Sequence, residues 1–148
     1  MSVIRVCTLV LIVALAACGT AGTAGTGTPT PTFGPATSAP NASPVVSAKG
    51  GITLKTPTTN AKLTSPVTIS GDASVFEAAL QWRITDTGGR VIVEGNTTAS
   101  LGAPGRGTYS VSATYTVSAE TPAFIEVYSR SAKDGTIDEI VRIPVTLR

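Results

Sequence analysis

The chain has 148 residues, a net charge of +2 and no histidine, so it lacks the commonest general base and the commonest metal ligand. Its two cysteines, Cys7 and Cys18, both lie in the apolar N-terminal region, which leaves no disulfide for the remainder. From residue 50 onward nine basic residues balance nine acidic ones, and nothing there indicates a nucleic-acid partner.

Residues 1–17 have the features of an export signal. Arg5 supplies an early positive charge, and residues 6–16 form an apolar run. That run is too short to cross a bilayer of about 30 Å, which takes about 20 helical residues. We therefore expect this segment to be a cleaved signal peptide, with Cys7 removed along with it.

The end of this segment, Leu15-Ala16-Ala17-Cys18, resembles the bacterial lipobox, in which small residues precede an invariant cysteine. The resemblance implies that the Cys18 thiol receives a diacylglycerol and that cleavage follows before Cys18. Because two or more acyl chains anchor a protein stably, we expect it to stay on the extracytoplasmic face of the cell membrane. The alternative is an ordinary signal peptide with Ala-x-Ala-like cleavage and an incidental cysteine.

Residues 18–49 follow as a stretch dominated by Thr, Pro, Gly, Ala and Ser. With almost no large apolar side chains, such a segment cannot offset the entropy cost of ordering its backbone. The composition predicts a disordered linker between the lipidated cysteine and the rest of the chain. The alternative is a proline-rich ligand for a partner.

The pattern changes at residue 50, where an all-β domain is expected to begin and to extend to residue 148. Short runs rich in β-branched and aromatic residues alternate with turn residues, and no run has a convincing helical period. Seven such runs favour a sandwich of two antiparallel sheets. The predicted strands are 52–55, 67–71, 79–85, 91–94, 109–117, 124–129 and 140–147, with turns at 86–89 and 133–136.

Within these strands, three features carry specific expectations. Leu80, Trp82 and Ile84 share one face, and Trp82 is predicted to be a central core residue with a satisfied indole N–H. The alternation over 109–117 is the cleanest in the chain and predicts a half-buried strand. Pro144 indicates that the last strand is an edge strand or carries a bulge.

The Ser-Pro-x-x-x-x-Gly signature at 65–71, followed by Phe-Glu-Ala at 76–78, resembles the immunoglobulin-like domain of bacterial spore germination proteins. Residues 128–135, leading into 143–145, are similar to the closing hairpin of that family. The resemblance covers about 52–147 and implies a non-enzymatic module with no catalytic residue to carry over. We expect Phe76 to close the end of the core and Gly71 to adopt a conformation closed to other residues. Glu77 is expected to accept hydrogen bonds there or to pair with Arg83 or Arg142.

Residues that could support chemistry are few. Asp134, Asp138 and Glu139 cluster near one turn, but their spacing does not match an EF-hand calcium loop. Serines occur without histidine or a Gly-x-Ser-x-Gly motif, and a Ser–Lys pair with Lys55 or Lys62 has no supporting spacing. The glycine-rich segment 102–107 is not followed by a helix, so it reads as an inter-strand loop. We expect no catalytic residue, no metal and no cofactor.

These observations favour a lipoprotein, anchored through Cys18, that presents an interaction or structural domain to an envelope protein or a cell-wall polymer. We expect no enzyme activity and no small-molecule substrate. The alternatives are a cell-wall-acting hydrolase, an accessory subunit of one, or a solute-binding lipoprotein, which would need a larger pocket. Sheet edges and the loop 99–107 are the places where binding is expected.

Overall fold

Residues 43–148, which the computed structural model describes, contain nine β-strands and a single 3-10 turn. The predicted signal peptide, the lipidation site and most of the expected linker lie outside these residues. The elements are β1 (Val45–Val46), β2 (Ile52–Thr56), β3 (Lys62–Leu63), β4 (Val67–Ala73), η1 (Phe76–Ala78), β5 (Ala79–Asp86), β6 (Val91–Thr98), β7 (Gly107–Ala113), β8 (Thr121–Arg130) and β9 (Ile137–Leu147).

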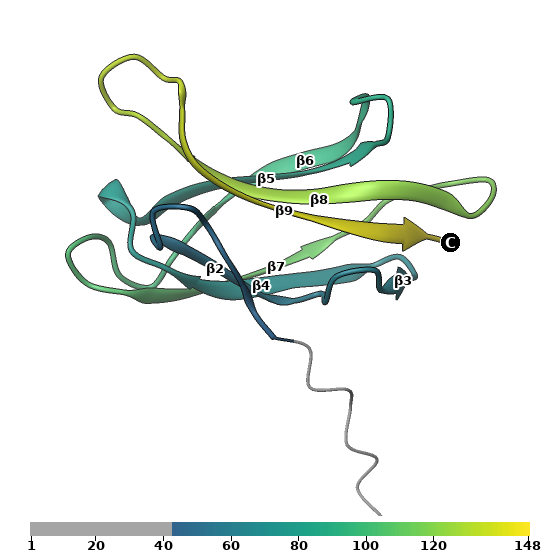
Figure 1. The fold of residues 1–148 in the computed structure, drawn as a ribbon, viewed down its shortest axis with the longest axis horizontal. Coiled ribbons are helices and arrows are strands. Elements are labelled where there is room, and N and C mark those ends of the chain that lie inside the picture. Colours follow the sequence, from purple (N-terminus) through teal and green to yellow (C-terminus); the bar gives the residue numbers. More distant parts are fainter. Residues whose placement is uncertain (1–42) are drawn as a thin grey trace, which may run out of the picture. The chain divides into compact units, whose positions relative to one another are not determined.

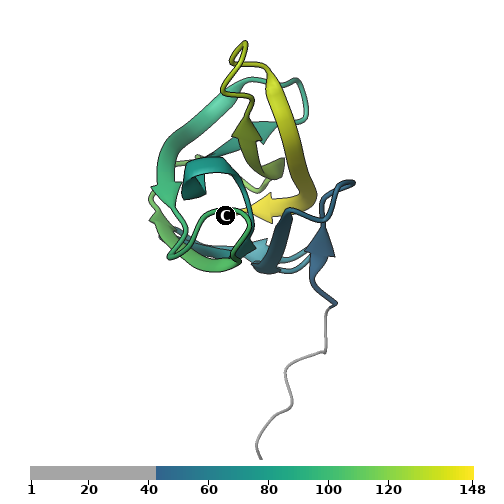
Figure 2. The ribbon, with the colours of Figure 1, turned by 90° about the vertical axis from the view of Figure 1, so that its left-hand side faces the viewer.

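The strands form two sheets that face each other as layers (Figure 1). One sheet has the order β1-β2-β4-β7, and the other has the order β3-β9-β8-β5-β6. Every pairing is antiparallel except that of β3 with β9, which is parallel and involves two residues of each strand. Figure 2 looks at the end that carries the 3-10 turn. The prediction of an all-β, immunoglobulin-like sandwich is confirmed.

The core lies between the two sheets and follows the alternation of the strands. Leu80, Trp82 and Ile84 of β5 are buried together as predicted, as are the alternate residues of β9. Because successive side chains of a strand point to opposite faces, each strand contributes one face to the core and one to the outside. The most completely buried large side chains are Ile52, Leu54, Ile69, Leu80, Ile84, Ile125, Val127, Val141, Ile143 and Leu147.

The sheets begin earlier than the sequence pattern indicates. Val45 and Val46 pair with Leu54 and Thr53, so β1 lies within the segment that was expected to be linker. Its two residues are too few to produce a visible alternation, and only the neighbouring strand makes them a strand.

One predicted strand is shorter than expected. β7 ends at Ala113, opposite Val67, whereas the alternating pattern runs to Val117. The residue before Val67 is Pro66, which has no N–H to continue the ladder. Tyr115 is nevertheless buried, because its backbone N–H donates to Ser65 Oγ at 3.0 Å and its hydroxyl donates to the carbonyl of Leu63 at 2.7 Å.

Pro144 lies where β9 has no regular strand on its outer side. β3 pairs only with Thr146 and Leu147, and the carbonyl of Pro144 accepts a hydrogen bond from the Asn60 N–H at 2.7 Å. The irregularity in the β8–β9 ladder falls at Ser129 and Arg130 instead. The last strand is thus not an edge strand of its sheet, because β3 lies outside it, and the predicted bulge does not fall at Pro144; the proline is accommodated because β3 is too short to pair with it.

The turn between β5 and β6 is held by one carboxylate. Asp86 accepts hydrogen bonds from the backbone N–H groups of Gly88 (3.0 Å) and Arg90 (2.9 Å) and from Arg90 Nε (3.0 Å). The hydrogen bond from the Arg90 side chain, together with these N–H groups, lowers the pKa of Asp86. Gly89 has a φ of +84°, which glycine adopts without steric cost. The predicted hairpin at 86–89 is confirmed.

The Phe-Glu-Ala segment differs from its expected role. Phe76 is 63% exposed, so it does not close the core, and Val75 and Ala78 are buried in its place. Glu77 is exposed, and the two arginines proposed as its partners both pair with Glu126 instead. Glu77 and Ala78 have φ values of 54° and 56°, which are uncommon for residues other than glycine, and this sharp reversal turns the Phe76 side chain outward.

Candidate functional site

The outer face of the five-stranded sheet carries an ordered row of charges. In the strand register, Glu94 of β6 lies opposite Arg83 of β5, Arg83 lies opposite Glu126 of β8, and Glu126 lies opposite Arg142 of β9. We call these four residues the charge row. Since paired residues lie on the same face of a sheet, the row presents the signs minus, plus, minus, plus across four adjacent strands.

Glu126 is the anchor of the charge row and is only 4% exposed. One of its carboxylate oxygens accepts a hydrogen bond from Arg83 Nε, and the other lies 3.1 Å from Arg142 Nε. A buried carboxylate is tolerated only when it is paired, and here each oxygen has its own guanidinium. The hydrogen bond to Glu126 raises the pKa of Arg83, so the arginine keeps its charge at any working pH.

Aromatic rings hold the arginines of this face in place. The guanidinium carbons of Arg83 and Arg130 lie 5.2 and 5.4 Å from the ring centroid of Tyr128. The guanidinium carbon of Arg142 lies 3.8 Å from the ring centroid of Phe124. These are cation–π distances, and they reduce the freedom that long side chains would lose on binding a partner.

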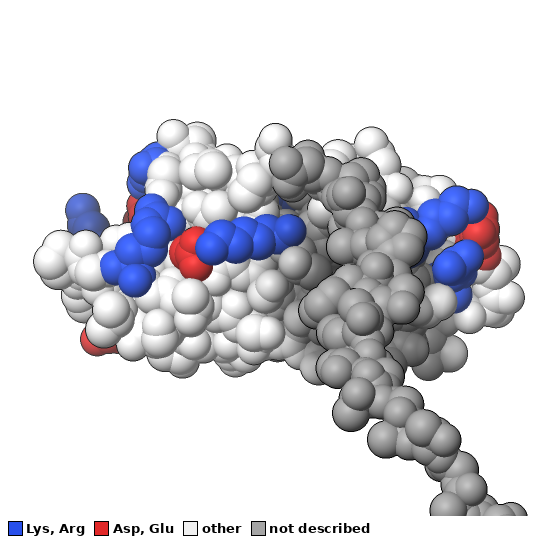
Figure 3. Space-filling view, turned by 90° about the horizontal axis from the view of Figure 1, so that it is seen from below, with Lys and Arg blue, Asp and Glu red and all other residues white. Residues whose placement is uncertain are grey.

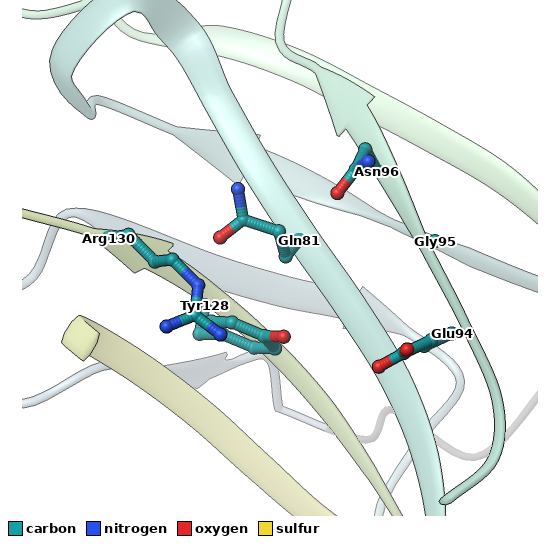
Figure 4. A pocket seen from close by; sticks show the side chains of 6 residues that line it. All are labelled: Gln81, Glu94, Gly95, Asn96, Tyr128 and Arg130. Atoms are coloured by element: carbon teal, nitrogen blue, oxygen red, sulfur yellow. The ribbon is translucent and has the colours of Figure 1, made fainter. Parts of the chain in front are cut away.

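Beside the charge row lies an open hollow of about 460 Å³. It is lined by Gln81, Glu94, Gly95, Asn96, Tyr128 and Arg130 (Figure 4). The side chain of Arg130 lies over the Tyr128 ring, and the other polar side chains come from the two neighbouring strands. Gln81 Oε1 is buried and has no hydrogen-bond partner within residues 43–148. An open hollow with polar walls suits contact with a polar surface better than enclosure of a small molecule.

The outer face of the four-stranded sheet is different in character. In the part visible in Figure 3, charges gather on both sides, and on one side blue, red and blue side chains lie in a line that runs toward the middle. Hydroxyl side chains occupy the outward positions of β4 and β7, including Thr68, Ser70, Ser110 and Ser112. Lys55 and Asp72 form an ion pair at 2.5 Å on this sheet. The charge row, with its four strand-paired residues, lies on the other, five-stranded sheet.

The acidic residues considered for calcium have other partners. Asp134 accepts hydrogen bonds from the N–H and hydroxyl of Thr136, which lower its pKa, and Asp138 pairs with Lys49 at 2.6 Å. Glu139 accepts a hydrogen bond from the Gly51 N–H at 3.1 Å. Across residues 43–148, no group of three or more His, Cys, Asp and Glu residues is arranged to hold a metal ion.

The other residues considered for catalysis or phosphate binding take part in ion pairs or loops of the fold. Lys55 is paired with Asp72, and Lys62 is paired with Glu120 at 3.2 Å. The glycine-rich segment lies, except for Gly107, in the predicted inter-strand loop, which covers residues 99–106 between β6 and β7, and the Ala103 N–H donates to the carbonyl of Val75 at 2.9 Å. Leu101 in this loop is exposed, so the loop remains a surface that a partner can reach.

Sequence reasoning missed the charge row. Arg83, Glu126 and Arg142 sit at outward positions of predicted strands, which was visible in the pattern. Their alignment depends on the register and order of β6, β5, β8 and β9, and one of the three pairings, that of β5 with β8, joins strands that are not consecutive in the chain. Only the assembled sheet brings the four charges into one line.

The described residues thus form an immunoglobulin-like sandwich, and the outer face of its five-stranded sheet carries the charge row and the polar hollow. The sequence model of the family described as the immunoglobulin-like domain of bacterial spore germination matches residues 51–136, more than half of the chain. The chain belongs to this family, whose domain is a non-catalytic fold type suited to structural and interaction roles. The match ends before β9, whereas the resemblance noted in the sequence extended to about 147.

No curated protein and no solved structure matches the chain. Between residues 43 and 148 the structure contains no helix long and apolar enough to cross a membrane.

Proposed function

We propose that this protein is a lipid-anchored component of the bacterial envelope whose immunoglobulin-like domain binds an envelope protein or a cell-wall polymer. The observation that carries the binding role is the outer face of the five-stranded sheet, with its pre-ordered arginines and its open polar hollow. The anchoring role rests on the lipobox-like sequence ending at Cys18.

The position of the first described strand supports this reading. The described chain begins at Ser43 and joins β1, which belongs to the four-stranded sheet. The charge row lies on the outward side of the other sheet, so the segment 43–46 does not cross it. The described start of the domain therefore leaves the outer face of the five-stranded sheet uncovered.

Replacing Cys18 by serine is expected to abolish lipidation and membrane attachment. The thiol is the atom that the lipid would modify, and a serine hydroxyl is a much weaker nucleophile. The full chain is expressed in a bacterial host, the cells are fractionated, and the mass of the N-terminal residue is measured. Wild type should be in the membrane fraction with an acylated first residue, and Cys18→Ser should lack the acyl mass.

Cys7→Ser is the matched control and should behave as wild type, because Cys7 lies within the expected signal peptide. Anchoring through Cys18 is contradicted if wild type carries no acyl mass, or if Cys18→Ser fractionates with membranes as wild type does.

A photo-crosslinking residue at Asn96 is expected to trap a component of the envelope in intact cells. Asn96 is exposed beside the hollow, whereas Ser110 is exposed on the other sheet and serves as the control position. Cross-linked species that form from position 96 and not from position 110 would place binding on the proposed face. Equal yields from both positions would contradict it, and release of soluble fragments from purified cell wall would favour a hydrolase instead.

A further inference from the structure

We propose that the outer face of the five-stranded sheet binds the same face of a second copy of this chain, forming a two-fold symmetric dimer. This inference rests on the proposed function, because it names one envelope partner for the same face.

The charge row is complementary to its own rotated image. Across β6, β5, β8 and β9 the signs are minus at Glu94, plus at Arg83, minus at Glu126 and plus at Arg142. A two-fold axis parallel to the strands and passing between β5 and β8 reverses this order. Each carboxylate then lies opposite an arginine of the second copy. A two-fold interface requires such a self-complementary surface, which an even number of alternating charges provides.

The two ends of the charge row are the charges available to a partner. Arg142 keeps about half of its side-chain exposure (49%), although it contacts Glu126. Glu94 is exposed and forms no ion pair with any residue in the described part of the chain. The side chain of Arg83 is 29% exposed and the side chain of Glu126 only 5%, so they mainly satisfy each other. Two contacts between Glu94 and Arg142, one at each end of the row, would therefore carry the charge complementarity of the dimer.

The surroundings of the charge row are compatible with this contact. In the neighbouring row, Asn96 lies opposite Gln81, Gln81 opposite Tyr128, and Tyr128 opposite Ile140, which is partly exposed. The same axis brings the apolar Ile140 of one copy toward the hollow beside Asn96 of the other. Arg130 donates to the carbonyl of Gly135 at 2.8 Å and lies over Tyr128, so its charge is held within its own domain.

Such a dimer is weak in solution and becomes effective on a membrane. Exposed ion pairs contribute about 0.2–1 kcal/mol each, so two of them produce modest affinity. Copies anchored to one membrane share a thin layer, and tethering raises the effective concentration toward the millimolar range. The proposed anchor at Cys18 therefore turns a weak self-contact into a populated one.

The test is sedimentation equilibrium of the full chain in a density-matched detergent at low salt, with charge-reversal variants. Wild type should form a reversible dimer. Glu94→Arg and Arg142→Glu should each weaken it about tenfold or more, because each reversal creates two like-charge contacts per dimer. The double variant Glu94→Arg/Arg142→Glu should recover the wild-type constant within about threefold. Ser110→Arg, on the other sheet, is the control and should leave the dimer unchanged.

The inference is overturned if wild type stays monomeric at all concentrations, or if the double variant is as weak as the single ones. If a single reversal lowers the folded fraction by circular dichroism, the salt dependence of wild type decides. Dimerisation that does not weaken between about 0.05 and 0.5 M salt also overturns it, since screening acts on exposed charges.

The proposed function and this inference fail separately. A monomeric chain that still carries acyl mass on Cys18, and still traps another envelope component from Asn96, contradicts only the dimer. A dimer formed by a chain with no acyl mass contradicts only the anchoring.

Discussion

Gly71→Ala is expected to lower the free energy of unfolding by about 3 kcal/mol or more, because a single added methyl group would overlap the backbone of the neighbouring strand. A Cβ at this position meets the carbonyl oxygen of Thr53 and lies 2.8 Å from the hydroxyl of Tyr109. That hydroxyl donates to the same Thr53 carbonyl at 3.1 Å. The methyl group would therefore separate β2 from β4 and leave a buried tyrosine hydroxyl without its acceptor.

The structure also corrects the reason that the sequence suggested for a glycine at this position. Gly71 is not among the glycines with positive φ, so its conformation is open to other residues. Glycine is required here because the backbone of β2 comes close to β4. The pairing of β2 with β4 is irregular at a neighbouring position.

Thermal unfolding of the full chain, followed by circular dichroism, measures the effect. For a domain of about a hundred residues, a loss of about 3 kcal/mol corresponds to a fall of roughly 12–24 °C in Tm. The control is Gly88→Ala, since a Cβ there has one neighbour, Asp86 Oδ1 at 3.3 Å, in an exposed turn. A Tm for Gly71→Ala within a few degrees of that control would refute the close-approach argument.

Trp82→Ala is expected to lower the free energy of unfolding by about 3–5 kcal/mol, because it removes the largest side chain of the core and leaves a cavity. The indole N–H is buried and has no hydrogen-bond partner in residues 43–148, so the expectation that it is satisfied was wrong. Trp82 therefore contributes through packing and not through a polar contact.

The neighbouring strand β6 leaves space for the Trp82 side chain. Trp82 lies opposite Gly95, and a Cβ at Gly95 would come within 2.7 Å of the indole ring. Gly95→Ala should therefore destabilise wild type by about 1–3 kcal/mol, and the same change should cost little or nothing in the Trp82→Ala background. A double-mutant cycle on Tm measures the coupling, and strictly additive effects would refute direct contact.

Gly71 and Trp82 stabilise different parts of the fold. Gly71 holds the four-stranded sheet together, whereas Trp82 lies between Gln81 and Arg83 in the strand that carries the hollow and the charge row. Loss of Trp82 is thus expected to disturb the candidate face as well as the core, and Gly71 variants serve as the comparison when binding is measured.

The local pattern of the chain determined the class of protein. Alternating residues in 79–85 and 140–147 place one face of each strand in the core, because the period of a strand is two whatever its neighbours are. The turns at 86–89 and 133–136 follow from Asp and Gly in short loops, where the controlling hydrogen bonds span a few residues. Family membership could also be predicted, because its signature motifs are contiguous in the sequence. The lipobox-like motif remains a prediction of the sequence alone.

Only the tertiary structure decided features that depend on distant partners. β1 is a strand because β2 lies beside it, and β7 stops at Ala113 because its neighbour begins after Pro66. Phe76 is exposed because the backbone reverses in a left-handed conformation that the residue types at 76–78 do not signal. The charge row exists because strand order and register bring four separated residues into line. The two hairpins, β5–β6 and β8–β9, have their register set by local turns, but the pairing of β5 with β8 joins strands that are distant in the chain, and no single stretch of sequence contains that pairing.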